Sequence, residues 1–120
     1  MKFQVTSENA NDSIVAFLDV GKNHPHFKGH FQNFPVLPAV SQIEMVVELL
    51  ELVWQKNVSI LSLSKGKFHN LLRPDTKCKL TVKIRTESKG SWVLESEDKV
   101  YSKGSFCYGE TAFDAGGLTI

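Results

Sequence analysis

The chain has 120 residues and a mass of 13.4 kDa, which suits one domain, and its apolar fraction of 42% is sufficient for one buried core. It carries 14 basic and 13 acidic side chains, so it lacks the strongly basic surface typical of dedicated nucleic-acid-binding proteins. No apolar run approaches the roughly 20 residues needed to span a bilayer, and the first residues lack the apolar segment of a signal peptide. The composition therefore predicts one soluble, cytoplasmic domain over 1–120, with neither nucleic-acid binding nor membrane insertion.

The charge is distributed unevenly along the chain. Residues 1–64 carry 4 basic and 6 acidic side chains, whereas residues 65–120 carry 10 and 7. This asymmetry weakly favours an acidic partner for the second half. The two cysteines, Cys78 and Cys107, are too few and too widely spaced for a disulfide framework or a Cys-x-x-Cys metal site. We therefore expect both to be reduced packing residues.

The first half of the chain predicts two strands, a loop and one helix. Apolar and β-branched residues over 13–20 predict a strand that pairs with another over 2–7. Three prolines and a glycine between His24 and Pro38 exclude a helix or a central strand there, so this segment is predicted to be a structured loop. Pro38 suits the first turn of a helix over 38–56, which is apolar around most of its circumference and hence mostly buried. A narrow polar stripe runs along this helix through Ser41, Glu44, Glu48, Glu51 and Gln55.

The second half changes to the period of two that is typical of strands. Four strands are predicted, over 58–63 with a broken continuation to about 72, and over 77–87, 92–96 and 99–110. Hairpin turns at 89–90 and 97–98 would join the later strands into an antiparallel meander. Ser102 and Gly104 share one face of the last strand, which predicts that this strand lies close to the helix. The fold class is therefore α+β, with an antiparallel sheet wrapped around one long helix, and 111–120 are predicted to form a loose tail.

Three of the four histidines lie in the proline-rich loop, at positions 24, 26 and 30. Together with Glu44 they could be assembled into a metal site. However, their spacing fits no dependable metal-binding motif, and Pro25 interrupts the first pair. We therefore predict no metal.

His30 and Glu44 form the more plausible chemical pair. A neutral imidazole is a competent base near neutral pH, whereas Glu44 would need an apolar, largely dry site to act as an acid. The backbone N–H groups near Ala39 and Val40, at the helix start, are suited to hold a carbonyl oxygen that gains negative charge. The alternative is structural, with Glu44 on a solvated helix face and His30 as a hydrogen-bonded packing residue. The residues alone thus define a candidate site and no reaction.

Residues 29–40, with the sequence GHFQNFPVLPAV, closely resemble the Gly-His-Phe-Pro-x-x-Pro-x-x-Pro-Gly-Val signature of hot-dog-fold β-hydroxyacyl-acyl-carrier-protein dehydratases. In that family the signature histidine is catalytic and a carboxylate fourteen residues later is its partner, which corresponds to His30 and Glu44. A fainter resemblance continues over 68–75 and 98–104. Two positions depart from the signature, because Gln32 replaces a proline and Ala39 replaces a glycine.

The resemblance implies a hot-dog fold and a reaction. The chain would reversibly dehydrate a (3R)-hydroxyacyl thioester to the trans-2-enoyl thioester, with His30 as base and Glu44 of the other subunit as acid. The backbone N–H groups of Ala39 and Val40 would bind the thioester carbonyl. Three further signature residues would line the substrate site: Gly29, Phe31 and Pro38.

The resemblance also implies partners. The protein would be a homodimer, with higher oligomers left open, and would need no cofactor besides the phosphopantetheine that the substrate carries. The acyl group would be attached to acyl carrier protein or to CoA. Acyl carrier protein is acidic, so basic residues would dock it unless they simply form a solvated face. The densest basic cluster consists of Lys65, Lys67 and Arg73, followed by Lys77 and Lys79.

Two other functions remain open at this point. A hot-dog acyl-thioesterase would use Glu44 to activate water or to attack the carbonyl. A non-catalytic acyl-binding or partner subunit would keep the fold without turnover. The histidine signature argues against the thioesterase.

Overall fold

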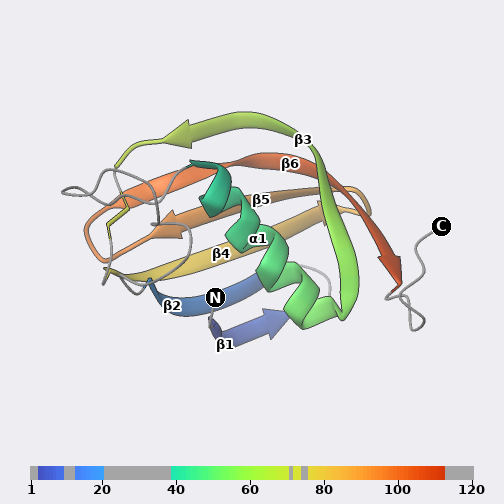
Figure 1. The fold of residues 1–120 in the computed structure, drawn as a ribbon, viewed down its shortest axis with the longest axis horizontal. Coiled ribbons are helices and arrows are strands. Elements are labelled where there is room, and N and C mark those ends of the chain that lie inside the picture. Colours follow the sequence, from blue (N-terminus) through green and yellow to red (C-terminus); the bar gives the residue numbers. More distant parts are fainter. Residues whose placement is uncertain (1–2, 10–12, 21–38, 71, 74–75, 113–120) are drawn as a thin grey trace.

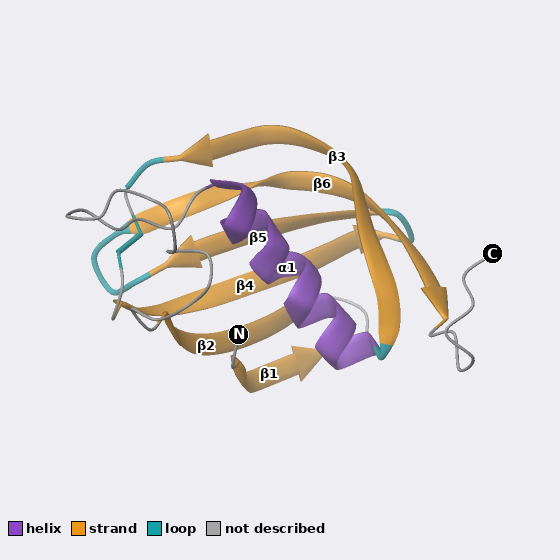
Figure 2. Ribbon diagram, in the orientation of Figure 1, coloured by secondary structure: helices purple, strands orange, loops and turns teal. Residues whose placement is uncertain are grey.

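The computed structural model describes residues 3–9, 13–20, 39–70, 72–73 and 76–112, which form one helix on one face of a six-stranded sheet (Figure 1). The elements are β1 (Phe3–Asn9), β2 (Ser13–Val20), α1 (Ala39–Trp54), β3 (Lys56–Phe68), β4 (Thr76–Thr86), β5 (Lys89–Glu95) and β6 (Val100–Ala112). All neighbouring strands are antiparallel, in the order β1-β2-β4-β5-β6-β3. Helix α1 lies across one face of this sheet, as Figure 2 shows. The predicted α+β layout is confirmed.

Helix α1 is held against the sheet by its apolar face. Met45, Val46, Leu49 and Leu50 are each at most 1% exposed, because residues three and four apart lie on the same side of a helix. Burying a side chain of this size contributes about 1.5–3 kcal/mol to folding. The helix ends before Gln55, which adopts a left-handed φ of 56°.

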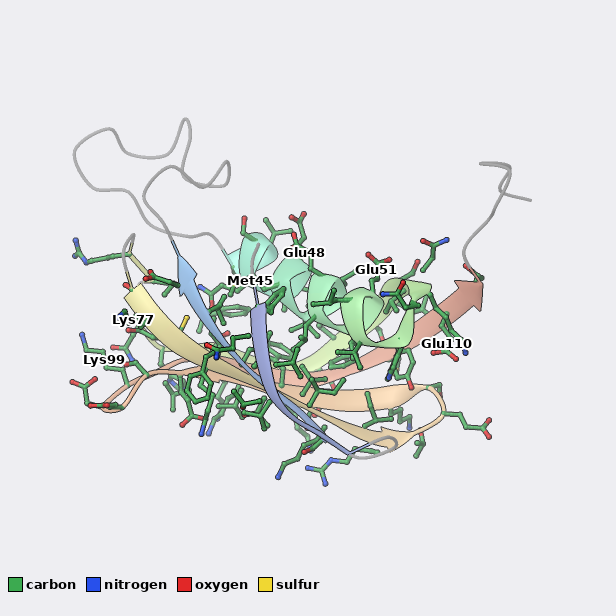
Figure 3. All side chains as sticks on the ribbon, turned by 90° about the horizontal axis from the view of Figure 1, so that it is seen from below. Met45, Glu48, Glu51, Lys77, Lys99 and Glu110 are labelled. Carbon is green, nitrogen blue, oxygen red and sulfur yellow. The ribbon has the colours of Figure 1, made fainter. Side chains whose placement is uncertain are left out.

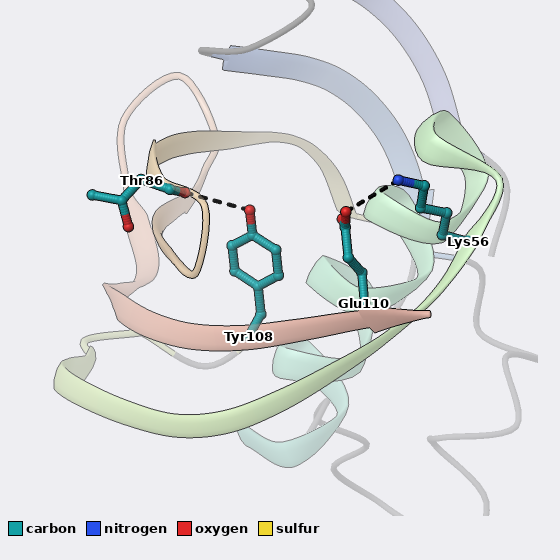
Figure 4. A network of polar contacts seen from close by, with 4 residues as sticks. All are labelled: Lys56, Thr86, Tyr108 and Glu110. Carbon is teal, nitrogen blue, oxygen red and sulfur yellow. Dashed lines mark hydrogen bonds and ion pairs between the residues drawn. The ribbon is translucent and has the colours of Figure 1, made fainter. Parts of the chain in front are cut away.

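The end of α1 is tied directly to the strand that follows. The carboxylate of Glu51 accepts a hydrogen bond from the backbone N–H of Val58 at 2.9 Å. The ring of Trp54 packs against that of Tyr108 on β6, with ring centroids 5.4 Å apart. Near this point, Lys56 forms an ion pair with Glu110 at 3.1 Å, and the Tyr108 hydroxyl donates to the carbonyl of Thr86 at 3.5 Å (Figure 4).

The sheet forms the other half of the core, because buried and outward-facing residues alternate along β4 and β5. Cys78, Leu80 and Val82 of β4 are buried, as are Trp92 and Leu94 of β5. The residues between them lie on the opposite face of the sheet. The predicted strand over 13–20 and its pairing with β1 are confirmed, and the turn at 97–98 also lies where it was expected.

The predicted turn at 89–90 is wrong. The hairpin turns at Glu87 and Ser88, and Lys89 already belongs to β5. The glycine at position 90 has a packing role, because a Cβ there would lie 2.7 Å from Cζ of Phe106 and 3.0 Å from the carbonyl oxygen of Lys83.

Strand β3 differs most from its prediction. It runs unbroken to Phe68 and pairs with β6, which places it at the edge of the sheet beyond the β4-β5-β6 meander. Two register shifts, between Ile60 and Ser62 and between Ser64 and Lys67, absorb its extra residues. They are β-bulges, and they explain why the hydrophobic alternation of this segment is irregular.

The end of β6 extends further than predicted. In the ladder with β3, Thr111 lies opposite Asn57 and Ala112 opposite Lys56, so these two residues belong to the strand and not to a tail. Residues 113–120 lie outside the described residues.

The small residues of β6 make room for a tryptophan and not for the helix. The Trp92 indole N–H donates to Oγ of Ser102 at 3.0 Å, and both residues are buried. A Cβ on Gly104 would lie only 2.6 Å from Cη2 of Trp92 and 2.9 Å from Cα of Gly66. The predicted close approach of β6 is therefore an approach to the ring of Trp92.

Candidate functional site

The start of α1 brings three of the predicted site residues together. Ala39 and Val40 form its first turn and Glu44 lies one turn further on, and all three are exposed on the single chain. Val40 and Glu44 are four residues apart and thus share one side of the helix. The first backbone N–H groups of a helix have no intrahelical acceptor and carry the positive end of the helix dipole. The described part of the site therefore combines a carboxylate with a place for negative charge.

The remaining predicted site residues, Gly29, His30, Phe31 and Pro38, lie outside the described residues. The pairing of His30 with Glu44 therefore stays a prediction. Glu44 lies on the side of α1 that faces away from the sheet, whereas Met45 and Leu49 face the core. The described residues of one chain leave Glu44 exposed, so they do not supply the dry surroundings that an acid would require.

Two polar residues near the start of α1 are buried. Ser41 was predicted to lie on the polar stripe, and Gln42 was not singled out. Ser41 is only 3% exposed and Gln42 only 4%, so Ser41 does not belong to a solvated stripe. Ser41 precedes the buried Met45 by one turn, and Gln42 precedes Val46 by one turn. That spacing is the signal that would have placed both of them on the sheet side of the helix. The start of α1 thus has a polar underside close to the candidate site.

The predicted carrier-docking residues lie on different elements. Lys65 is exposed at a bulge of β3, where its φ is 55°, and Lys67 lies opposite Lys103 of β6. Arg73 is exposed in the connection between β3 and β4. Lys77 lies on β4, two strands further from β3 than β6 is. The structure thus gathers Lys65 and Lys67 at one end of β3 and separates them from the lysines of β4.

A separate open groove of about 400 Å³ lies along the edge formed by β1, β2 and β4, and it contains none of the predicted catalytic or substrate-binding residues. It is lined by Phe3, Gln4, Phe17, Leu18, Asp19, Lys77 and Cys78. Burial, followed by the nearby charge of Asp19, raises the pKa of Cys78 to about 12. Its thiol therefore stays protonated near neutral pH and is a poor nucleophile. Cys78 and Cys107 are both free thiols, as expected for packing residues.

The described part of the chain has neither a metal-binding cluster nor a membrane-spanning helix. No three His, Cys, Asp or Glu side chains within it lie close enough to hold a metal ion. Its single helix is too short and insufficiently apolar to cross a membrane.

One helix lying across a six-stranded antiparallel sheet defines a hot-dog-fold protein, and comparison with solved structures agrees. The dehydratase heterocomplex ApeI:P from Xenorhabdus doucetiae superposes with a TM-score of 0.77 at 22% identity, over 90% of this chain and 98% of that chain. Thioesterase superfamily member 2 from Mus musculus superposes with a TM-score of 0.64 at 12% identity, over 91% and 81% of the two chains. These similarities establish the fold.

Sequence comparison establishes the family. Residues 6–105 match the model of the ApeI-like family, described as ApeI dehydratase. The 3-hydroxyacyl-[acyl-carrier-protein] dehydratase FabZ of Thermotoga neapolitana is 30% identical over 97 residues, which cover 78% of this chain and 71% of that protein. The chain belongs to the ApeI-like dehydratase family. The resemblance seen in residues 29–40 is thereby confirmed at the level of the family.

Proposed function

We propose that this protein reversibly dehydrates a (3R)-hydroxyacyl thioester to the trans-2-enoyl thioester. The observation that carries the proposal is the family match over residues 6–105, which includes both His30 and Glu44. These two residues stand fourteen apart, as the catalytic pair of the dehydratase signature does. Glu44 is exposed near the start of α1 on the single chain, so this role requires that a second subunit covers it.

In the proposed reaction, the imidazole of His30 removes the proton from the α-carbon of the substrate. The electron pair of that C–H bond forms the new double bond, the bond between the β-carbon and the hydroxyl breaks, and Glu44 supplies the proton with which the hydroxyl leaves as water. The N–H groups of Ala39 and Val40 bind the carbonyl oxygen, where negative charge develops. Gly29, Phe31 and Pro38 line the site. No step needs a metal or a redox cofactor.

The acyl group is proposed to be carried on phosphopantetheine, in acyl carrier protein or in CoA, in the cytoplasm. Support comes from the FabZ relatives, whose name specifies an acyl-carrier-protein substrate. An acidic carrier would meet Lys65, Lys67 and Arg73, all of which are exposed. Exchange of Lys65 and Lys67 for glutamate should slow turnover of the carrier-bound substrate and leave a small thioester mimic unaffected. Equal loss on both substrates would contradict docking at these residues.

The active form is proposed to be a homodimer built through β3. This 13-residue strand lies at an edge of the sheet, where its backbone groups are open to pairing. It carries three large apolar side chains that are 69%, 48% and 43% exposed: Leu61, Leu63 and Phe68. A second copy paired along this strand would cover them. The partner would then supply the Glu44 that completes the site around His30.

The experiment that tests the function is the hydration of an enoyl thioester, followed by the loss of its ultraviolet absorbance. His30→Ala and Glu44→Gln should each reduce turnover by about 10²-fold or more, since positioned acids and bases contribute about 10²–10⁴-fold. Glu48→Gln, one turn further along the same helix, is the matched control and should stay active. Release of free thiol from an acyl thioester would indicate a thioesterase. No turnover on short or long acyl groups would indicate a non-catalytic subunit.

A further inference from the structure

The face of the sheet opposite α1 is rich in lysine. The ladder register places six lysines there, together with two carboxylates, those of Asp19 and Glu95. We call this surface the basic face, and its lysines are Lys67, Lys77, Lys79, Lys83, Lys89 and Lys103. Asp19 lies opposite Lys77 and Glu95 opposite Lys79. The other four lysines have no carboxylate directly opposite in the described ladders.

One pair on this face is unfavourable for folding. Lys67 of β3 and Lys103 of β6 are direct partners in the ladder, and both are exposed. Like charges in directly opposed positions of a sheet are destabilising. An unfavourable arrangement of this kind is typical of surfaces that have a binding role.

The charge is also separated across the molecule. Glu44, Glu48 and Glu51 lie on α1. Figure 3 shows Glu48 pointing away from the sheet, whereas the Glu51 carboxylate is bound to the backbone of β3. The acidic helix side and the basic face thus lie on opposite sides of the fold. An extended negative surface would therefore attract the basic face and repel the side of α1 that carries Glu44.

The composition of the basic face distinguishes among negatively charged partners. Most residues between the lysines are small hydroxyl residues, and Val15, Val93 and Cys107 share the face with them. Lysine and serine are both depleted at protein–protein interfaces. Single-stranded nucleic acids need aromatic platforms in addition to positive charge, whereas Phe17 is the single aromatic residue that the described ladders place on this face. The small residues are Ser13, Thr81, Ser91, Ser105 and Ser64.

The dimensions of the face favour a lipid surface. The lysines spread from β4 to β3, which spans about 14 Å at 4.7–4.9 Å per strand. This is wider than one helix but suits several lipid headgroups. Phe17 is 47% exposed and lies in register with Lys79, and an apolar ring beside basic residues is typical of peripheral membrane binding. We propose that the basic face docks on the surface of an anionic lipid bilayer, with α1 directed toward water.

The test uses the full chain and sedimentation with lipid vesicles, so it does not depend on the proposed enzymatic activity. The protein should bind vesicles of equal parts phosphatidylglycerol and phosphatidylcholine, should not bind pure phosphatidylcholine, and should dissociate near 0.5 M salt, where the Debye length is roughly 4–5 Å. One basic residue near an anionic lipid surface raises the affinity for that surface by about a factor of five. Lys103→Glu should therefore weaken binding about fivefold or more, and Lys83→Glu with Lys103→Glu about 30-fold or more.

Two controls separate docking from folding and from net charge. Lys103→Glu replaces a like-charge pair with an opposite-charge pair, so it should raise the melting temperature while it weakens binding. Lys99→Glu changes the net charge equally, but Lys99 lies in the turn between β5 and β6, and binding should stay within about twofold. Equal weakening by both variants, or no binding to anionic vesicles, would overturn the proposal. Salt-sensitive binding to acyl carrier protein or duplex DNA without vesicle binding would assign the basic face to that partner instead.

Discussion

Substituting Gly104 by alanine tests how tightly the neighbouring strands β5, β6 and β3 pack around Trp92. The new Cβ would lie 2.6 and 2.7 Å from two ring atoms of Trp92 and 2.9 Å from the backbone of Gly66, so neither side can yield easily. Overpacking of a core costs about 1–3 kcal/mol, and contact with backbone puts this site near the upper end. We expect Gly104→Ala to lower the free energy of unfolding by about 3 kcal/mol and the melting temperature by about 10 °C.

The same strand provides the control. A Cβ on Gly109, also on β6, would meet Cδ1 of Leu61 at 3.7 Å, an ordinary contact, so Gly109→Ala should change stability by less than about 1 kcal/mol. Thermal melts and urea titrations measure both variants. The clashing atoms belong to the six-membered ring of the indole, so combining Gly104→Ala with Trp92→Phe should cost at least about 1 kcal/mol less than the sum of the single changes. Equal stability of the two alanine variants would refute the packing argument.

Three further predictions concern stability. The pKa of the Cys78 thiol is raised to about 12 in the folded protein, so the folded state holds this proton more tightly than the unfolded state does. The resulting stabilisation is complete below the unfolded-state pKa and declines as the pH rises. The free energy of unfolding should therefore be about 2 kcal/mol lower at pH 10. Urea titrations from pH 7 to pH 10 should show this decline, and a Cys78→Ala variant with an equally steep decline would contradict it. Ser102→Ala leaves the buried indole N–H of Trp92 without its acceptor and should cost about 1–3 kcal/mol, measured by chemical denaturation against Ser105→Ala on the same strand. The Lys56–Glu110 ion pair is 47% and 37% exposed, so a double-mutant cycle should give a coupling of at most about 1 kcal/mol that falls as salt is added; a larger, salt-independent coupling would be the contrary result.

Local patterns predicted the elements well because each element has one strongly patterned face. The helix was expected over 38–56 and is described from Ala39 to Trp54, since apolar residues recur at helical spacing throughout. The strand over 13–20 matches at both ends because alternation and flanking turn residues agree. Ser41 was misplaced because it lies at the border of the polar stripe, one turn before the buried Met45.

Long-range pairing was beyond local patterns. Nothing within 56–68 shows that β3 joins the sheet beside β6, because that placement depends on contacts with residues 34 to 56 positions away. The glycine after Lys89 looks like a turn residue, but it lies within β5, where its lack of a side chain allows close packing against Phe106. The candidate site depended on the signature in 29–40 and not on periodicity, which alone would place Glu44 on a solvated face.

The most direct test of the proposed shared site mixes two inactive variants. If His30 of one subunit works with Glu44 of the other, co-refolding of His30→Ala with Glu44→Gln creates dimers in which one of the two sites is intact. Random pairing of equal amounts in a symmetric dimer should then restore about a quarter of the native rate of enoyl-thioester hydration. Each variant refolded alone should remain inactive. No recovery in mixtures that demonstrably contain mixed dimers would contradict a dehydratase site shared by two copies of this chain.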